Sequence, residues 1–254
     1  MTTALDVALP AAAALWGAAA GALLPRAAYR FSAPAGEEWR SKCPAGHRIE
    51  GWLGHARCTP CTRGARPTDT KQGKYGPRAG LLALVTGLVC VALALATGTR
   101  PELAGWLLLA PVGVLLAVVD FRVQRLPDPL TLPLAAAALG LLGVAALLPE
   151  HAGHWLTSLY AALALGAGYL VLFLINPGGM GFGDVKLALG AGAVLGWYGW
   201  PTVLLGTFAG FVYGALYGAA LVVVRRAGRK SAIAFGPFLI AGAFTGLLIG
   251  AYTA

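Results

Sequence analysis

The sequence predicts an all-helical polytopic membrane protein, with about eight transmembrane helices and a small Cys-containing domain between the first two. Hydrophobic residues occupy 58% of its 254 positions and charged residues only 11%, about half the charged share of a soluble domain. Several apolar runs of about 17 residues or more can cross the hydrocarbon core as helices. Helices satisfy their own backbone polar groups in lipid, and the 36 glycines favour close helix packing.

Eight apolar segments are the predicted transmembrane helices. In chain order they span residues 7–25, 79–98, 103–119, 130–148, 155–175, 185–197, 201–224 and 233–252. The sixth segment is short and has Lys186 almost at its start, so we expect this helix to begin below the membrane surface. An even number of helices places both termini on the same side of the membrane.

The basic residues predict the orientation of the helices. Eighteen of the 19 Lys and Arg residues follow odd-numbered helices and lie on one face, whereas Arg100 lies on the other. The positive-inside rule makes the crowded face cytoplasmic and places both termini outside. This topology accounts for the net charge of +9, so we expect no nucleic-acid partner. No basic residue precedes the first apolar run, unlike in a secretory signal peptide, and we expect a retained helix.

These features divide the chain into three regions. The first transmembrane helix occupies residues 1–29, a cytoplasmic basic segment occupies 30–78, and a seven-helix membrane domain occupies 79–254. The basic segment (residues 30–78) carries ten basic and four acidic residues and is too short to build a large core. A folded domain of this size needs a staple, such as a bound metal ion.

Three of the four cysteines lie in the basic segment, within KCPAGH and RCTPCT. Cytoplasmic thiols stay reduced, so a metal site is favoured over a disulfide. Cys58 and Cys61 form a Cys-x2-Cys pair, which is half of a usual tetrahedral zinc site. Cys43 offers a third ligand, and His47 or His55 offers the fourth. The alternative is three reduced thiols in a loop that binds no metal.

Three aspartates outside the basic segment lie at cytoplasmic helix ends. Asp128 sits in Pro-Asp-Pro before an apolar run, which is typical of a helix start capped by aspartate. Asp184 follows GGMGFG, whose four glycines let the backbone turn tightly and approach another group. Asp120 ends the third predicted helix, where the helix dipole and the membrane boundary both disfavour a carboxylate. An ion pair with Arg122 or Arg125 is the alternative explanation for Asp120.

Asp120 and Asp184 come from predicted helices that are not adjacent in the chain but end at the same membrane face. If the two carboxyl groups meet, they cannot easily be ionised at the same time, so one stays protonated beside its ionised partner. The ionised member can take a proton from water while the neutral member polarises a peptide carbonyl, as in aspartic proteases. The competing hypothesis is a proton-coupled transporter in which the same aspartates relay protons.

The chain resembles the prepilin peptidases, or type IV leader peptidases, in three motifs that follow the family's order. The first is Asp, a short loop and Leu-Pro-Asp, in VVDFRVQRLPDPLTLPL. The second is Gly-x-Gly-Asp, in GMGFGDVKLALG, and the third is the FGP segment, in AFGPFLIAGA at 234–243. The resemblance implies an aspartic protease of the bacterial inner membrane, with Asp120 and Asp184 as catalytic residues. It also implies that water is the nucleophile and that proteolysis needs no cofactor.

The resemblance further implies the substrate, a prepilin or pseudopilin of a type IV pilus or protein secretion system. Its basic leader stays in the cytoplasm and its apolar helix lies in membrane lipid, and we expect Gly181, Gly183 and Lys186 to contact it. Many family members also N-methylate the new N-terminus with S-adenosylmethionine, through their first cytoplasmic domain. Gly46 breaks the second Cys-x2-Cys pattern of that domain here, and no glycine-rich fingerprint for the cofactor is visible in it.

Overall fold

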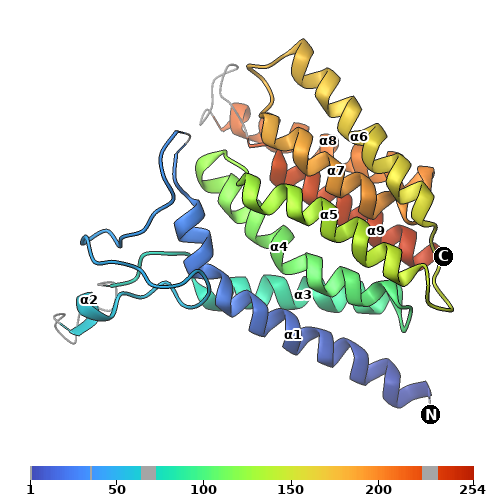
Figure 1. The fold of residues 1–254 in the computed structure, drawn as a ribbon, viewed down its shortest axis with the longest axis horizontal. Helices are drawn as coiled ribbons and strands as arrows, with labels where there is room; N and C mark the ends of the chain where they lie inside the picture. Colours follow the sequence, from blue (N-terminus) through green and yellow to red (C-terminus); the bar gives the residue numbers. More distant parts are fainter. Residues whose placement is uncertain (1, 35, 64–72, 225–233) are drawn as a thin grey trace.

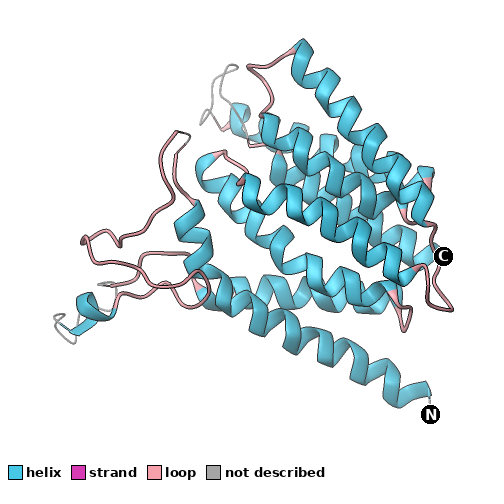
Figure 2. Ribbon diagram, viewed as in Figure 1, coloured by secondary structure: helices cyan, strands magenta, loops and turns pink. Residues whose placement is uncertain are grey.

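The computed structural model describes residues 2–34, 36–63, 73–224 and 234–254. Within these residues the regular structure is helical, and two isolated β-bridges in the basic segment are the only extended pairing (Figure 2). The helices are α1 (Thr2–Phe31), α2 (Thr59–Arg63), α3 (Ala79–Thr97), α4 (Glu102–Val123), α5 (Asp128–Ala145), α6 (Trp155–Ile175), α7 (Phe182–Gly196), α8 (Trp200–Val223) and α9 (Gly236–Thr253). The predicted all-helical class is therefore confirmed for this part of the chain.

The long helices run alternately back and forth through one bundle (Figure 1). Both termini lie at one end of the bundle, together with the connections before α4, α6 and α8. The opposite end carries the described part of the basic segment, the connections before α5 and α7, and the start of α9. This alternation is the one that eight crossing segments require, and it gathers the helix ends that carry the candidate aspartates at a single end.

Seven of the described helices are long and apolar enough to cross a membrane, namely α1, α3, α4, α5, α6, α8 and α9. The remaining predicted span corresponds to α7, whose 15 residues extend only about 22 Å, less than the roughly 30 Å hydrocarbon core. It begins at Phe182 rather than at residue 185, so Asp184 lies in its first turn. Because α7 packs against α5, α6 and α9, protein surrounds most of this short helix.

The first helix extends further than the sequence predicts. Its predicted end was residue 25, but α1 continues past Pro25 to Phe31. The extension is stabilised by the basic segment, because Arg26 Nη1 donates a hydrogen bond to the carbonyl of Glu50 (2.7 Å) and Arg30 Nη1 to that of Gly51 (2.7 Å). Part of the predicted linker (64–72) lies outside the described residues, as do Arg225, Arg226, Arg229 and Lys230.

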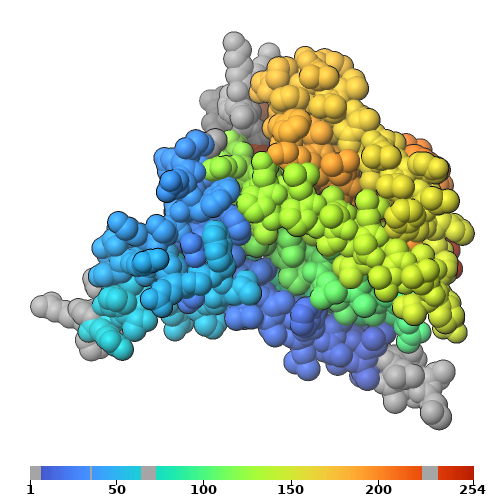
Figure 3. Space-filling view, in the orientation of Figure 1, coloured from blue at the N-terminus to red at the C-terminus, as the bar shows by residue number. Residues whose placement is uncertain are grey.

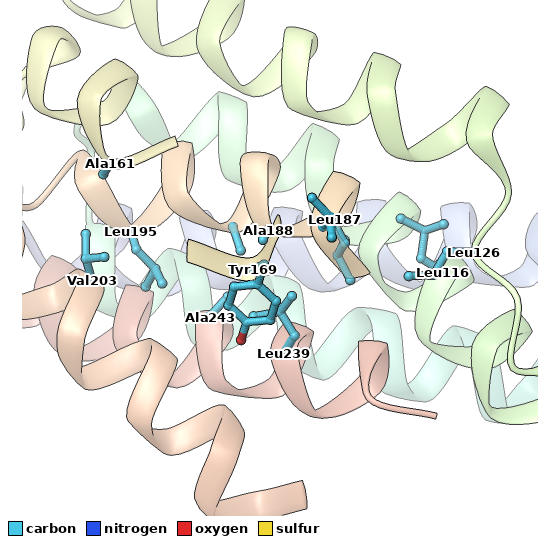
Figure 4. Close-up of a cluster of buried hydrophobic side chains, with 12 residues drawn as sticks. Leu116, Leu126, Ala161, Tyr169, Leu187, Ala188, Leu195, Val203, Leu239 and Ala243 are labelled. Carbon is cyan, nitrogen blue, oxygen red and sulfur yellow. The ribbon is translucent and has the colours of Figure 1, made fainter. Parts of the chain in front are cut away.

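A buried apolar cluster joins the helices around α7 (Figure 4). It includes Tyr169 from α6, Leu187 from α7, Leu239 from α9 and, at the edge nearest the loops, Leu126. In lipid such packing stabilises a bundle through close contact rather than through removal from water. The start of α7 is therefore held in the middle of the bundle, beside the loop that follows α4.

Candidate functional site

Asp120 and Asp184 line one cleft of about 500 Å³ at the loop end of the bundle. The cleft is formed by the end of α4, the α4–α5 loop, the α6–α7 loop and the starts of α7 and α9. The two aspartates are 64 positions apart in the chain (184 − 120), and α5, α6 and their connections lie between them. The structure thus brings together the two carboxylates that the sequence singled out.

The Asp120 side chain is buried near the end of α4, with 4% of its surface exposed. Its Oδ2 atom makes no hydrogen bond to any described residue. It lies against the first residue of α9, because a Cβ atom built on Gly236 would come within 2.6 Å of that oxygen. A buried carboxylate oxygen without a partner carries a large desolvation cost, which a water molecule or a substrate in the cleft would relieve.

The Asp184 side chain is equally buried, with 5% of its surface exposed. One of its oxygens, Oδ2, accepts a hydrogen bond from the backbone N–H of Gly181 at 3.2 Å. Asp184 therefore caps the start of α7. Both buried carboxyl groups thus face the same cleft. Two acids that meet in such a cleft share a proton more readily than they both ionise.

Asp128 occupies a different environment from the other two aspartates. Its side chain is 62% exposed and forms an ion pair with Lys186 Nζ at 2.7 Å. The predicted cap at this position is wrong, because Pro127 precedes the helix and no side chain caps it. The ion pair instead joins the start of α5 to the first turns of α7 across the cleft.

The proposed ion pair between Asp120 and a nearby arginine is also absent among the described residues. Arg125 Nη1 instead donates hydrogen bonds to the carbonyls of Pro34 (2.8 Å) and Glu37 (3.1 Å). Its guanidinium also lies 4.2 Å from the centre of the Trp39 ring. Among the residues that the structure describes, the buried carboxylate of Asp120 thus has no ion-pair partner, which argues against a purely structural ion pair.

The three residues expected to contact substrate all line the same cleft. Gly181 and Gly183 lie on either side of Phe182 at the start of α7, and Lys186 follows one turn later. A Cβ atom on Gly183 would approach the Cβ of Leu126 to 2.9 Å. The glycine at 183 therefore permits close approach between α7 and the α4–α5 loop.

A second group of polar side chains lies in the basic segment, beyond the end of α1. The Cys43, Cys58 and Cys61 sulfurs and one nitrogen of His47 all lie within 4.8 Å of one another. His47 Nδ1 is 3.6 Å from the first two Sγ atoms and 3.2 Å from the third. His55, the other histidine considered, is not part of this group. The four residues can hold a metal ion.

The thiols of this group differ in acidity. Burial by itself raises the pKa of Cys43, but hydrogen bonds with His47 outweigh it and lower this pKa to about 6. The hydrogen bond with Cys58 raises the pKa of Cys61 to about 11, and burial adds to the effect. The first thiol thus ionises readily and the last resists ionisation. A bound cation removes that resistance, because metal ligation favours thiolates.

Comparison with known proteins supports the resemblance seen in the motifs. Residues 107–219 match the family described as "Type IV leader peptidase family". A protein of Escherichia coli K12 named "Prepilin leader peptidase/N-methyltransferase" is 37% identical over 172 residues, covering 63% of this chain and 71% of the relative. The chain belongs to the type IV leader peptidase family. With seven membrane-length helices in its described part, this family member is a multi-pass membrane protein.

Other relatives of this leader peptidase family member carry the same name. The Pseudomonas aeruginosa protein is 31% identical over 220 residues, covering 83% of this chain and 71% of the relative. The Aeromonas hydrophila protein is 34% identical over 207 residues and 78% of this chain, but the match spans only 64% of the relative's length. No solved structure matches the chain.

Sequence reasoning missed two residues of this leader peptidase family site. Leu126 is buried where the α4–α5 loop meets the starts of α7 and α9, since a Cβ on either Gly183 or Gly236 would approach it within 3.4 Å. Gly236 lies in the FGP segment, which the motif comparison had noted, but only the fold shows that it touches Asp120. No sequence signal distinguishes Leu126 from the other leucines of the chain.

Proposed function

We propose that this chain is an intramembrane aspartic endopeptidase that removes the leader from type IV prepilins or pseudopilins. The observation that carries the proposal is the cleft that two buried carboxylates, Asp120 and Asp184, line together. The names of the relatives supply the substrate class, because the proteins of E. coli and P. aeruginosa are called prepilin leader peptidases. Membership of this family gives no support to the transporter hypothesis.

The proposed reaction uses the two acids in complementary protonation states. The ionised carboxylate takes a proton from a water molecule, whose oxygen attacks the scissile carbonyl. The neutral carboxyl donates its proton to the carbonyl oxygen as the tetrahedral intermediate forms. Collapse of this intermediate breaks the C–N bond, and a proton from the dyad passes to the leaving amine. Gly181, Gly183 and Lys186 line the cleft, and we assign to them the contacts that hold the substrate strand beside the acids.

The proposed location is the bacterial inner membrane, with the cleft at the cytoplasmic face and both termini outside. Support comes from the charge asymmetry of the sequence, in which 18 of 19 basic residues follow the first, third, fifth and seventh predicted spans. The helix ends and loops that line the cleft lie at the same end of the bundle as the basic segment (Figure 1). A basic leader would remain at this face while the apolar part of the prepilin lies in membrane lipid.

The direct test is co-expression of the chain with a prepilin from the same genome, tagged at its C-terminus. We expect a shorter tagged product, whose new N-terminus is identified by mass spectrometry. A prepilin that keeps its full length when the membrane-inserted enzyme is present would contradict the proposed activity.

We propose that Cys43, His47, Cys58 and Cys61 hold a structural zinc ion. A tetrahedral ion with bonds of about 2.3 Å to sulfur and about 2.0 Å to nitrogen separates sulfurs by roughly 3.8 Å and sulfur from nitrogen by roughly 3.5 Å. The Sγ atoms of Cys43 and Cys61 are 3.9 Å apart, and the nitrogen–sulfur distances lie between 3.2 and 3.6 Å. Such an ion would cross-link the basic segment and takes no part in proteolysis.

Replacing Cys58 with serine is expected to remove the metal. The purified wild-type chain should contain about one zinc ion, and the Cys58→Ser variant much less, because three ligands hold zinc weakly. Elemental analysis by mass spectrometry measures this content directly. The matched control is Cys90→Ala, because Cys90 is buried within α3 and far from the group in sequence. Equal zinc content in the wild type and Cys58→Ser would refute the site.

N-methylation also occurs in the names of the relatives. The described residues of the basic segment consist of loops, two isolated β-bridges and the five-residue α2. They offer no group that we can assign to S-adenosylmethionine, so the reaction above includes no step with this cofactor. Incubating membranes with radiolabelled S-adenosylmethionine and processed pilin tests whether the chain has this second activity.

Replacing Asp128 with asparagine is expected to change the rate of leader cleavage by less than about fivefold. The reason is that the Asp128 side chain of the Asp128–Lys186 ion pair is largely exposed to solvent. Exposed ion pairs contribute roughly 0–1 kcal/mol to stability. The measurement is the initial rate of prepilin cleavage in membranes containing equal amounts of each enzyme. A loss as large as that expected for Asp120 or Asp184 would mean that the assignment of the dyad is wrong.

A further inference from the structure

Two neighbouring residues of the α4–α5 loop (124–127) contact different parts of the molecule. Arg125 contacts three residues that follow α1, through hydrogen bonds to Pro34 and Glu37 and through the face of the Trp39 ring. Leu126 is buried on the other side, between Gly183 at the start of α7 and Gly236 at the start of α9. The loop therefore lies between the basic segment and the two helix starts that border the carboxylates.

The outer contact, made by Arg125, combines hydrogen bonds with the stacking of charge on an aromatic ring. The guanidinium of Arg125 donates to the carbonyls of Pro34 and Glu37, and bonds from a charged donor are stronger than neutral ones. Trp39 in turn packs edge-on against Phe31, the last residue of α1, with ring centres 5.2 Å apart. In the space-filling view, the segment after α1 rises beside the green surface near residues 120–130 (Figure 3). The end of α1 thus fixes the place of Arg125.

The inner contact, made by Leu126, is with two glycines that border the acids. Gly183 is the residue before Asp184, and its Cβ position is 2.9 Å from the Cβ of Leu126. Gly236 touches the carboxylate of Asp120, and its Cβ position is 3.3 Å from the Cδ1 of Leu126. A shift of Leu126 therefore changes the space available beside both carboxylates.

We propose that Arg125 and Leu126 are positioning residues that set the placement of Asp120 relative to Asp184. Their support is formed by Pro34, Glu37 and Trp39. The inference rests on the proposed proteolytic function. It assigns to the basic segment a role in leader cleavage. Pro34, Glu37 and Trp39 hold Arg125, and the residue after Arg125, Leu126, lies between the starts of α7 and α9.

The test compares kcat and KM for a purified prepilin with the full-length enzyme in detergent. Arg125→Ala and Leu126→Ala should lower kcat about 10- to 100-fold, because displacement of catalytic groups by about 1 Å has effects of this size. KM should change much less, since neither substitution removes the groups assigned to substrate binding. Arg125→Lys should restore part of kcat, because lysine keeps one donor and the contact with the Trp39 ring.

The control is Arg122→Ala. Arg122 carries the same charge three positions earlier, is exposed, and makes no hydrogen bond or ion pair among the described residues. It should keep wild-type kcat, so an equal loss in Arg122→Ala and Arg125→Ala would overturn the proposal in favour of a general charge effect. Wild-type kcat in Arg125→Ala would also overturn it.

The support from Pro34, Glu37 and Trp39 is tested by Trp39→Leu, alone and together with Arg125→Ala. The two changes remove the same contact from opposite sides, so the double variant should lose little more kcat than Arg125→Ala. Additive losses would overturn the role of this contact, and this pair of variants decides the question even if Leu126→Ala does not fold. A wild-type enzyme that cleaves no prepilin would refute the proposed function, whereas normal cleavage by both wild type and Arg125→Ala refutes only the inference.

Discussion

Replacing either Asp120 or Asp184 with asparagine is expected to lower the rate of leader cleavage by about 1,000-fold or more. Asparagine keeps the size of the side chain but can neither accept a proton from water nor donate one to the carbonyl oxygen. Since each acid supplies one of these transfers, the loss in the double variant should be hardly greater than in either single variant. The measurement is the amount of processed prepilin at fixed times, at equal enzyme levels in the membrane.

The outcome separates the two hypotheses considered for these residues. Both single variants should insert into the membrane normally, because a neutral side chain is easier to bury than a carboxylate. Substantial cleavage by Asp120→Asn or Asp184→Asn would remove that residue from the dyad. If cleavage requires neither residue, the aspartic protease mechanism itself is wrong, and the cleft must serve another reaction.

Replacing Gly236 with alanine is the change with the next largest expected effect. The added methyl group would lie 2.6 Å from Oδ2 and 3.2 Å from Cγ of Asp120, and 3.3 Å from Leu126 Cδ1. The carboxylate must therefore move or α9 must shift, and a displacement of about 1 Å in a catalytic group can cost about 100-fold in rate. We expect a loss of this size in kcat for prepilin cleavage, although alanine favours helix formation over glycine.

Gly168→Ala provides the matched control for this prediction. Gly168 lies within α6, and a Cβ atom there would meet nothing within 4 Å. This variant should cleave at the wild-type rate and show that a methyl group on a bundle helix is tolerated. If Gly236→Ala cleaved equally well, the carboxylate of Asp120 would not be held in the position that the structure shows.

The sequence was a good guide where hydrophobicity and local composition decide the structure. Lipid requires each spanning segment to satisfy its own backbone, so seven apolar runs predicted helices that the structure contains. The remaining predicted segment, the sixth in chain order, corresponds to α7. With 15 residues, α7 is too short to qualify by its length as a membrane-spanning helix. Its length is tolerated because neighbouring helices cover it, and such burial cannot be deduced from α7's own residues.

The candidate site was only partly predictable, for a related reason. Asp120 and Asp184 could be predicted as site residues because a carboxylate at the membrane boundary costs free energy, whatever residues it contacts in the fold. The cap assigned to Asp128 was wrong, because its side chain forms an ion pair with Lys186, 58 positions away in the chain (186 − 128). Likewise, Arg125 was considered as a partner of Asp120, but the carbonyls of Pro34 and Glu37 hold it.

The sequence by itself determined the membrane class, the helical segments, the uneven placement of positive charge and the residue types available for chemistry. These properties follow from transfer energies and from motifs that need no knowledge of distant contacts. Only the tertiary structure decided that the two acids share a cleft, that His47 rather than His55 joins the cysteines, and that Leu126 lies between Gly183 and Gly236. Each of these contacts joins residues from separate helices or loops, so its geometry depends on how the whole bundle packs.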